Sequence, residues 1–126
     1  MMRLLINTFG TRGDIQPFVA LALGMQRAGH SVRICTAEGY RSFIEGYGLD
    51  YAPMDNSLYE FMNSQEGKET VEGNRSPLAM IKQVTPMIRR ALDDEWAAAQ
   101  AFEPDIILHH PKSLVQNQTT FSVTVR

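Results

Sequence analysis

The chain has 126 residues, of which 44% are hydrophobic and 21% charged, a size and balance typical of one soluble globular domain with a single core. Its formal net charge of −2 at pH 7 and its scattered basic residues exclude the electrostatic pattern of a nucleic-acid-binding protein. The single cysteine, Cys35, has no partner for a disulfide, so we expect a buried thiol in a reducing compartment and no metal bound through cysteine.

The N-terminal third predicts a strand–helix–strand unit. Arg3–Phe9 is a short apolar run typical of a strand that is buried on both faces. After a turn with two glycines, apolar residues at helical spacing predict a helix over Pro17–Ala28, which a proline opens and Gly29 closes. Ser31–Thr36 alternates and is rich in β-branched residues, which predicts a second strand parallel to the first.

The middle of the chain continues this alternation and then becomes polar. Gly39–Tyr47 predicts a second helix, and Leu49–Pro53 predicts a short third strand. In the polar stretch that follows, we expect a helical turn over Ser57–Met62 and a mobile loop over Gln65–Asn74. The few apolar residues of this stretch, Tyr59, Phe61 and Met62, indicate either a small satellite core or part of an acceptor pocket.

The C-terminal part predicts one long helix, a strand and an unusual tail. Ser76–Phe102 keeps helical spacing, but Pro86 lies within it and predicts a kink or a division into two helices. Ile106–His109 supplies a fourth strand, and Thr119–Val125 favours an extended conformation over a helix. We therefore predict an α/β fold, a Rossmann-like parallel sheet in the order 3-2-1-4, whose outer edge and apolar helix faces are left uncovered.

The turn after the first strand is the first candidate site. Gly10 and Gly13 allow close approach of the backbone, and the following helix N-terminus favours anions, although a tight turn required by geometry explains the glycines equally well. Asp14 is a helix cap, a general base that takes the proton from an acceptor hydroxyl, or both. Arg12 either meets a diphosphate or is a solvated turn residue, and Thr11 completes the loop.

Two histidines form the second candidate. His109 and His110 lie at the carboxyl end of the fourth strand, the edge at which open α/β sheets bind ligands. Because adjacent residues of a strand point to opposite sides, we expect at most one of them to face a site. The candidate substrate-binding residues are therefore Gly10, Thr11, Arg12, Gly13, His109 and His110, and no metal site is predicted.

The loop also carries a family resemblance. It reads Gly-Thr-Arg-Gly-Asp-Ile-Gln-Pro from Gly10 to Pro17, and Ala20–Ala22 and Arg27–Val32 follow it. Together these residues resemble the N-terminal signature of family 28 glycosyltransferases, especially the sterol-glucosyltransferase-like members. The resemblance covers roughly residues 3–112, implies the N-terminal half of a GT-B fold, and implies a catalytic base at Asp14. Residues 113–126 depart from it, so we assign an incomplete acceptor-binding domain to 1–112 and an atypical tail to 113–126.

The resemblance implies transfer of a hexosyl group from a nucleotide sugar, such as UDP-glucose, to the hydroxyl of a sterol, lipid or other hydrophobic acceptor. It implies no cofactor, and it places the donor mainly on a C-terminal half that this chain lacks. We therefore expect the chain to be inactive alone. Peripheral membrane contact and self-association through the sheet edge or the tail are further expectations, and no nucleic acid is expected.

Other interpretations remain open at this point. The chain could be a stand-alone flavodoxin-like module that binds a phosphate-bearing ligand, or a non-catalytic remnant whose tail mediates oligomerisation. No stretch approaches the roughly 20 apolar residues that span a bilayer, and the N-terminus shows no signal-peptide cleavage pattern. From these two observations we expect a cytoplasmic protein.

Overall fold

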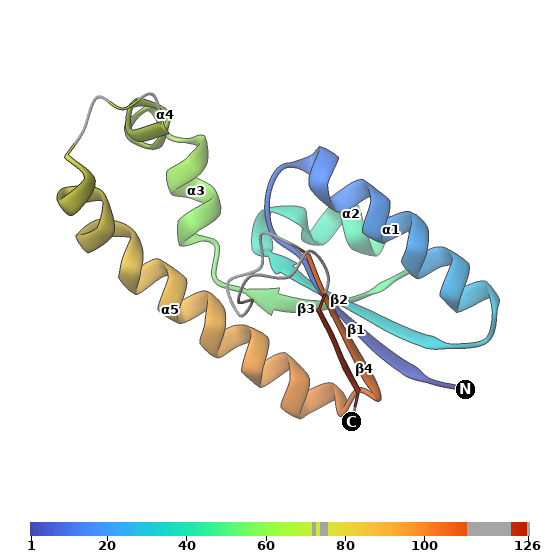
Figure 1. The fold of residues 1–126 in the computed structure, drawn as a ribbon. Helices are drawn as coiled ribbons and strands as arrows, with labels where there is room; N and C mark the ends of the chain where they lie inside the picture. Colours follow the sequence, from blue (N-terminus) through green and yellow to red (C-terminus); the bar gives the residue numbers. More distant parts are fainter. Residues whose placement is uncertain (72, 74–75, 111–121, 126) are drawn as a thin grey trace.

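The described part of the chain is organised around one five-stranded sheet (Figure 1). The computed structural model describes residues 1–71, 73, 76–110 and 122–125. Strands β1 (Arg3–Asn7), β2 (Ser31–Ala37), β3 (Asp50–Met54) and β4 (Ile106–His109) run parallel. Their order is 3-2-1-4, which confirms the predicted topology.

A fifth strand occupies the outer edge of β4. Strand β5 (Ser122–Val125) pairs antiparallel with β4, so that Val125 lies opposite Ile106 and Ser122 opposite His109. The prediction of an extended tail is confirmed for these four residues. The expectation of an uncovered edge beyond the fourth strand is wrong, because β5 takes the hydrogen bonds that this edge offers. Residues 111–121 and 126 of the tail lie outside the described residues.

Helix α1 (Arg12–Arg27) begins at Arg12 and not at the predicted Pro17, which lies inside it. Thr11 precedes the helix in an extended conformation, and the carboxylate of Asp14 accepts a hydrogen bond from the Thr11 N–H at 2.9 Å. This bond is one half of a capping box, which starts a helix without help from a proline. The missing N–H of Pro17 therefore removes one hydrogen bond without delaying the helix.

The second predicted helix is divided in the structure. A 3₁₀ turn, η1 (Glu38–Tyr40), leaves the end of β2, and α2 (Arg41–Gly46) continues from it to the turn before β3. Glu38 and Glu45 both form ion pairs with Arg41, at 3.4 and 3.1 Å. These exposed pairs join the turn to the helix.

The polar stretch contains two helices. The predicted helical turn is α3 (Ser57–Asn63), which is confirmed. The expected mobile loop is wrong over α4 (Gln65–Val71), because Ser64 caps this helix by accepting a hydrogen bond from the Gly67 N–H on its side-chain oxygen at 3.0 Å. Polar composition alone did not reveal this cap.

Helix α5 (Pro77–Phe102) is a single helix of 26 residues that continues through Pro86, so its division into two helices is wrong. Pro86 and Lys82, whose carbonyl Pro86 cannot bond, are both exposed. The hydroxyl of Thr85 donates to the carbonyl of Ile81 at 2.5 Å beside it.

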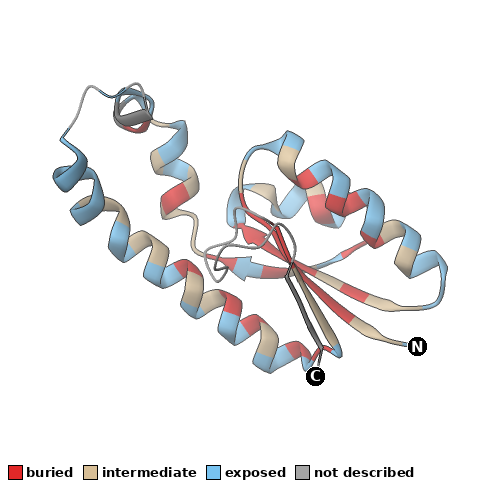
Figure 2. Cartoon of the chain, viewed as in Figure 1, coloured by how far each residue is buried: buried red, intermediate tan, exposed pale blue. Residues whose placement is uncertain are grey.

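The helices cover the two faces of the sheet in separate layers. Figure 1 shows α1 and α2 on one side and α5 on the other, with α3 and α4 beside the N-terminal half of α5. Alternate residues of β1 divide accordingly, because Leu4 and Ile6 pack under α1 whereas Leu5 packs under α5. Buried residues concentrate in the sheet and along its flanking helices, and the start of α5 is exposed (Figure 2). No helix within the described ranges is long and apolar enough to cross a bilayer.

Candidate functional site

The loop between β1 and α1 lies at the carboxyl end of the sheet, as the sequence predicted. Gly10 has a φ of +136°, a conformation that side chains disfavour, and a Cβ built on it would collide with the Asp14 carboxylate. Gly13 lies inside α1, and a Cβ there would meet only the Thr11 hydroxyl oxygen, at an ordinary 3.7 Å. Of the two loop glycines, Gly10 is the one that the geometry requires.

The structure gives Asp14 the capping role that the sequence offered, and its role as a general base stays a prediction. Its Oδ2 accepts hydrogen bonds from the N–H of Thr11 at 2.9 Å and from the Thr11 hydroxyl at 3.0 Å. Its Oδ1 lies 3.9 Å from Nε2 of His110. The side chain is 22% exposed, so the carboxylate caps α1 with one oxygen while part of it still meets solvent.

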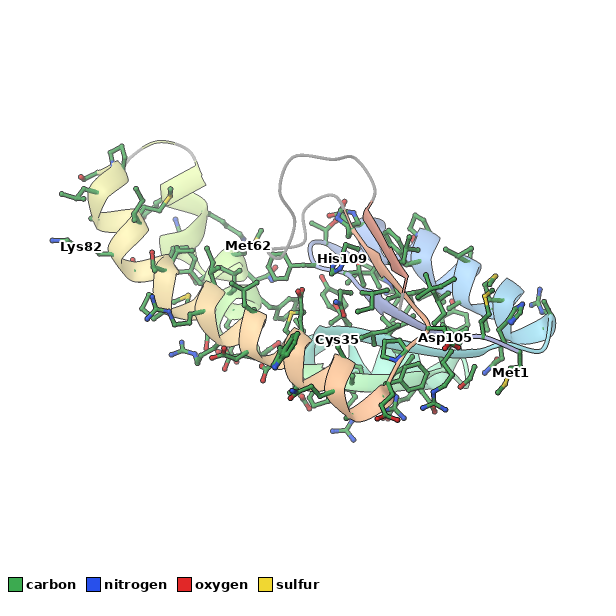
Figure 3. The ribbon with its side chains drawn as sticks, turned by 60° about the horizontal axis from the view of Figure 1, so that its bottom comes forward. Met1, Cys35, Met62, Lys82, Asp105 and His109 are labelled. Carbon is green, nitrogen blue, oxygen red and sulfur yellow. The ribbon has the colours of Figure 1, made fainter. Side chains whose placement is uncertain are left out.

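The two histidines face opposite sides of the sheet, as strand alternation requires. The N–H of His110 donates to the carbonyl of Asn7 at 2.9 Å, and its ring packs edge-on against Phe18 of α1 at 5.3 Å between centroids. His109 instead lines a cavity of about 340 Å³ on the α5 side (Figure 3). Burial lowers the pKa of His109. The structure therefore brings His110 to Asp14 and keeps His109 away.

A second cavity, which we call the aromatic cavity, opens beside the loop. It has a volume of about 460 Å³ and is lined mainly by aromatic, glycine and loop residues: Phe9, Gly10, Thr11, Arg12, Gly39, Tyr40, Phe43, Tyr59, Met62 and Asn63. The residues Tyr59 and Met62, which the sequence offered for an acceptor pocket, are among them; Figure 3 labels Met62 on α3. Phe61 is not among the lining residues.

Tyr40 and Phe43, two aromatic residues of this wall, were not predicted as site residues from the sequence. Tyr40 donates its hydroxyl hydrogen to the carbonyl of Gly10 at 2.9 Å, and its ring meets Tyr59 edge-on at 5.0 Å between centroids. Burial, with smaller contributions from Tyr59 and Asp14, raises the pKa of the Tyr40 hydroxyl. The one signal in the sequence that could have identified Tyr40 and Phe43 is their position just after β2, because the loops that bind ligands follow the carboxyl ends of the strands.

Arg12 also belongs to this wall. Its side chain is exposed, and its guanidinium lies 4.5 Å from the centre of the Phe43 ring, within the range of a cation–π contact. The positive charge of Arg12 therefore lies at the same edge of the sheet as the β1–α1 loop. Contact with a diphosphate remains a prediction for this residue.

Buried polar side chains gather at the carboxyl ends of β1 and β2. Asn7, Thr8 and Thr36 are almost completely buried, and within the described part of the chain their side-chain oxygens have no hydrogen-bond partner. Buried polar groups without a partner cost stability. Cys35 lies on the α5 side of the sheet (Figure 3), where burial raises the pKa of its thiol and makes it unreactive.

No metal site appears in the described ranges, since no group of three or more His, Cys, Asp or Glu side chains is placed to hold an ion there. The candidate site is thus one carboxylate with a nearby imidazole, next to an aromatic cavity. Such a site can take a proton from a hydroxyl and hold an apolar molecule that carries it.

Comparison with known proteins identifies the family. The model of the glycosyltransferase family 28 N-terminal domain matches residues 4–115. A sterol 3-beta-glucosyltransferase of Sclerotinia sclerotiorum is 30% identical over 117 residues, which cover 90% of this chain and 8% of that protein. The UDP-sugar-dependent glycosyltransferase 52 of Dictyostelium discoideum is 34% identical over 115 residues, covering 87% of this chain and 6% of that protein. The chain thus spans less than a tenth of either curated relative.

Solved structures agree with the fold. The glycosyltransferase SsfS6 of Streptomyces sp. SF2575 has a TM-score of 0.61 at 24% identity over 86% of this chain and 33% of its own. The calicheamicin glycosyltransferase CalG4 has a TM-score of 0.62 at 16% identity over 86% of this chain and 26% of its own. These likenesses show the GT-B architecture. The chain belongs to glycosyltransferase family 28, and it forms the N-terminal domain of that GT-B fold.

Proposed function

We propose that this chain is the acceptor-binding lobe of an enzyme that transfers a hexosyl group from a nucleotide sugar to the hydroxyl of a sterol, lipid or other hydrophobic acceptor. The observation that carries this proposal is the position of Asp14. Its carboxylate caps α1 near the carboxyl end of β1, and the adjoining residues Gly10–Arg12 are part of the wall of the aromatic cavity. A base and an apolar binding wall therefore lie side by side.

In the proposed reaction the acceptor oxygen attacks the anomeric carbon of the sugar and forms the new glycosidic bond. The bond from that carbon to the diphosphate breaks, and its electron pair leaves with the nucleoside diphosphate. The hydroxyl proton passes to Asp14 in the same step, because a free alcohol is far too weak an acid to lose it beforehand. A single displacement of this kind inverts the anomeric carbon.

The aromatic cavity supports a hydrophobic acceptor. Its volume of about 460 Å³ is within the range of small-molecule sites, and its four aromatic rings offer apolar contact beside the polar side chains of Thr11, Arg12 and Asn63. The Sclerotinia relative is named for a sterol acceptor and a glucosyl group. A sterol or a similarly flat, apolar alcohol is therefore the acceptor class that we propose.

Support for the class of sugar donor comes from the relatives and the solved structures alone. The Dictyostelium relative is named for UDP-sugars, and SsfS6 and the spinosyn rhamnosyltransferase SpnG have been solved with thymidine diphosphate. We propose a nucleotide sugar such as UDP-glucose, held mainly by a second lobe. Without that lobe one wall of the cleft is missing, so we expect no transfer by this chain alone.

The test is a titration of the ¹⁵N-labelled chain with cholesterol delivered in cyclodextrin, with empty cyclodextrin as the blank. We expect saturable shifts at Tyr40, Phe43 and Tyr59, and about tenfold weaker binding by Phe43→Ala, whereas Leu78→Ala at the exposed start of α5 binds normally. Shifts that avoid the aromatic cavity, or tight binding of FMN instead, would contradict the proposal. Incubation with UDP-glucose and a sterol panel should give no product above the blank.

A further inference from the structure

We propose that His110 is a substrate-binding residue that acts beside Asp14, and that the carboxylate and the imidazole together hold the acceptor hydroxyl. This inference rests on the proposed function and deepens it. It assigns to His110 a task that neither its place in the strand nor the family match gives it.

The two side chains meet from separate elements. Oδ1 of Asp14, on α1, lies 3.9 Å from Nε2 of His110, at the end of β4. The side chain of His110 is 11% exposed and that of Asp14 is 22% exposed, so water screens the pair only in part. The edge-on contact with Phe18 restrains the ring, and the bond from the backbone N–H of His110 to the carbonyl of Asn7 fixes the backbone that carries it.

The spacing suits a shared hydroxyl. An oxygen about 2.8 Å from each of two atoms that are 3.9 Å apart makes an angle near 90° between them, which a hydroxyl group can accept. In this position the hydroxyl donates its hydrogen to Oδ1 and accepts one from Nε2. The second oxygen, Oδ2, is already held by Thr11, so the carboxylate cannot turn away from the hydroxyl.

Among the described residues, charged and titratable groups reach the pair from α1 and from the turn after β2. From α1 the ring meets Asp14 and the uncharged Phe18. From the turn after β2 comes Tyr40, a neutral phenol whose pKa is raised further, mainly by burial and slightly by the charge of Asp14. The guanidinium of Arg12 lies over the ring of Phe43. A protonated His110 would therefore lie opposite the carboxylate charge of Asp14.

During transfer His110 keeps its own hydrogen. The proton of the acceptor moves to Asp14, while the Nε2–H of His110 directs the lone pair of the acceptor oxygen toward the sugar. The imidazole is thus a substrate-binding group, and the base is the carboxylate. Loss of the imidazole should leave apolar binding intact and remove the recognition of the hydroxyl.

The first test measures the coupling of the pair in the chain itself. The ring protons of the histidines are titrated by NMR in the wild type, in Asp14→Asn and in the control Asp50→Asn, whose exposed carboxylate pairs with Arg33 on the far strands. In Asp14→Asn the midpoint of His110 should fall by about 0.5 pH unit or more, and in the control it should not move. Equal His110 midpoints in all three proteins would overturn the proposal. If Asp14→Asn fails to fold, the titration of Asp14 is measured instead, from the NMR signal of its carboxyl carbon in the wild type and in His110→Gln. The titration midpoint of Asp14 should be higher in His110→Gln.

The second test measures recognition of the hydroxyl. The wild type should prefer cholesterol over cholestane, which lacks the hydroxyl, by about fivefold or more. His110→Phe should bind both equally, with unchanged affinity for cholestane, because a phenyl ring keeps the contact with Phe18. A preference that survives in His110→Phe overturns the proposal. Absence of any sterol binding by the wild type would instead defeat the proposed function, whereas the titration of the pair would still be decided by the first test.

Discussion

Replacing Gly10 with alanine tests whether the β1–α1 loop requires a glycine at this position. Gly10→Ala adds one methyl group at a φ of +136°, where it meets the Asp14 carboxylate. Two costs follow: the strained backbone and the displacement of Asp14 from its bond to Thr11. Gly13→Ala is the matched control, because the same methyl group makes only ordinary contact within α1.

The size of the effect follows from these two costs. Holding a residue other than glycine at such a φ costs about 1–3 kcal/mol, and loss of the helix cap costs about 1 kcal/mol. We therefore expect Gly10→Ala to lower the free energy of unfolding by about 2–4 kcal/mol. Gly13→Ala should leave it unchanged or raise it by up to about 1 kcal/mol, because alanine is the better helix former.

Urea unfolding followed by circular dichroism measures both values, and the carboxyl signal of Asp14 in the NMR spectrum reports its displacement. The alanine at position 10 should move that signal, and the alanine at position 13 should not. Ordinary surface substitutions change the free energy of unfolding by about 0.5 kcal/mol or less. If the values of both variants lay within that range of the wild type, the loop would not depend on Gly10 and the reasoning would be refuted.

Three further predictions concern other parts of the chain. Burial lowers the pKa of His109, so as the pH falls below about 6.5 the imidazole is protonated in the unfolded chain before it is protonated in the folded one. The free energy of unfolding should therefore fall between pH 7 and pH 5.5. Urea midpoints measured across this range should change less with pH in His109→Gln than in the wild type. The thiol of Cys35, with its raised pKa, should react with iodoacetamide at pH 8 at least about a hundredfold faster in urea than in buffer, and equal rates would contradict its burial. Gly39→Ala would place a methyl group 2.5 Å from the Tyr59 ring and should weaken sterol binding about tenfold, whereas Gly46→Ala, with open space around it, should bind like the wild type.

Local signals in the sequence were enough for most of the fold. The apolar runs of the parallel strands and the glycine at the end of the first helix lie within a few residues of the elements they specify. The start of α1 was misplaced because Pro17 was weighted above the capping pair of Thr11 and Asp14, although the spacing of the pair was visible. Helix α4 was missed because its cap, Ser64, stands in a polar stretch whose composition favours a loop.

The site was only half visible in the sequence. The loop motif pointed to Asp14, because a single stretch contains the strand end, the glycine and the carboxylate. Its neighbour His110 comes from the other end of the chain and arrives only because β4 pairs with β1. The aromatic cavity likewise joins residues of the β1–α1 loop, the turn after β2, and α3. Contacts of this kind depend on strand order and helix packing, which a linear pattern does not specify.

The geometry of Asp14 bears directly on why one lobe should not act alone. Thr11 donates twice to one of its oxygens, and such bonds stabilise the ionised carboxylate. A carboxylate stabilised in this way is a weak base, so it can accept the proton of an alcohol only while the new bond to the sugar is forming. That bond requires a leaving diphosphate whose charge is held in place. Because the proposal assigns that task to a second lobe, the same bonds that order Asp14 make its chemistry depend on the partner lobe that brings the donor.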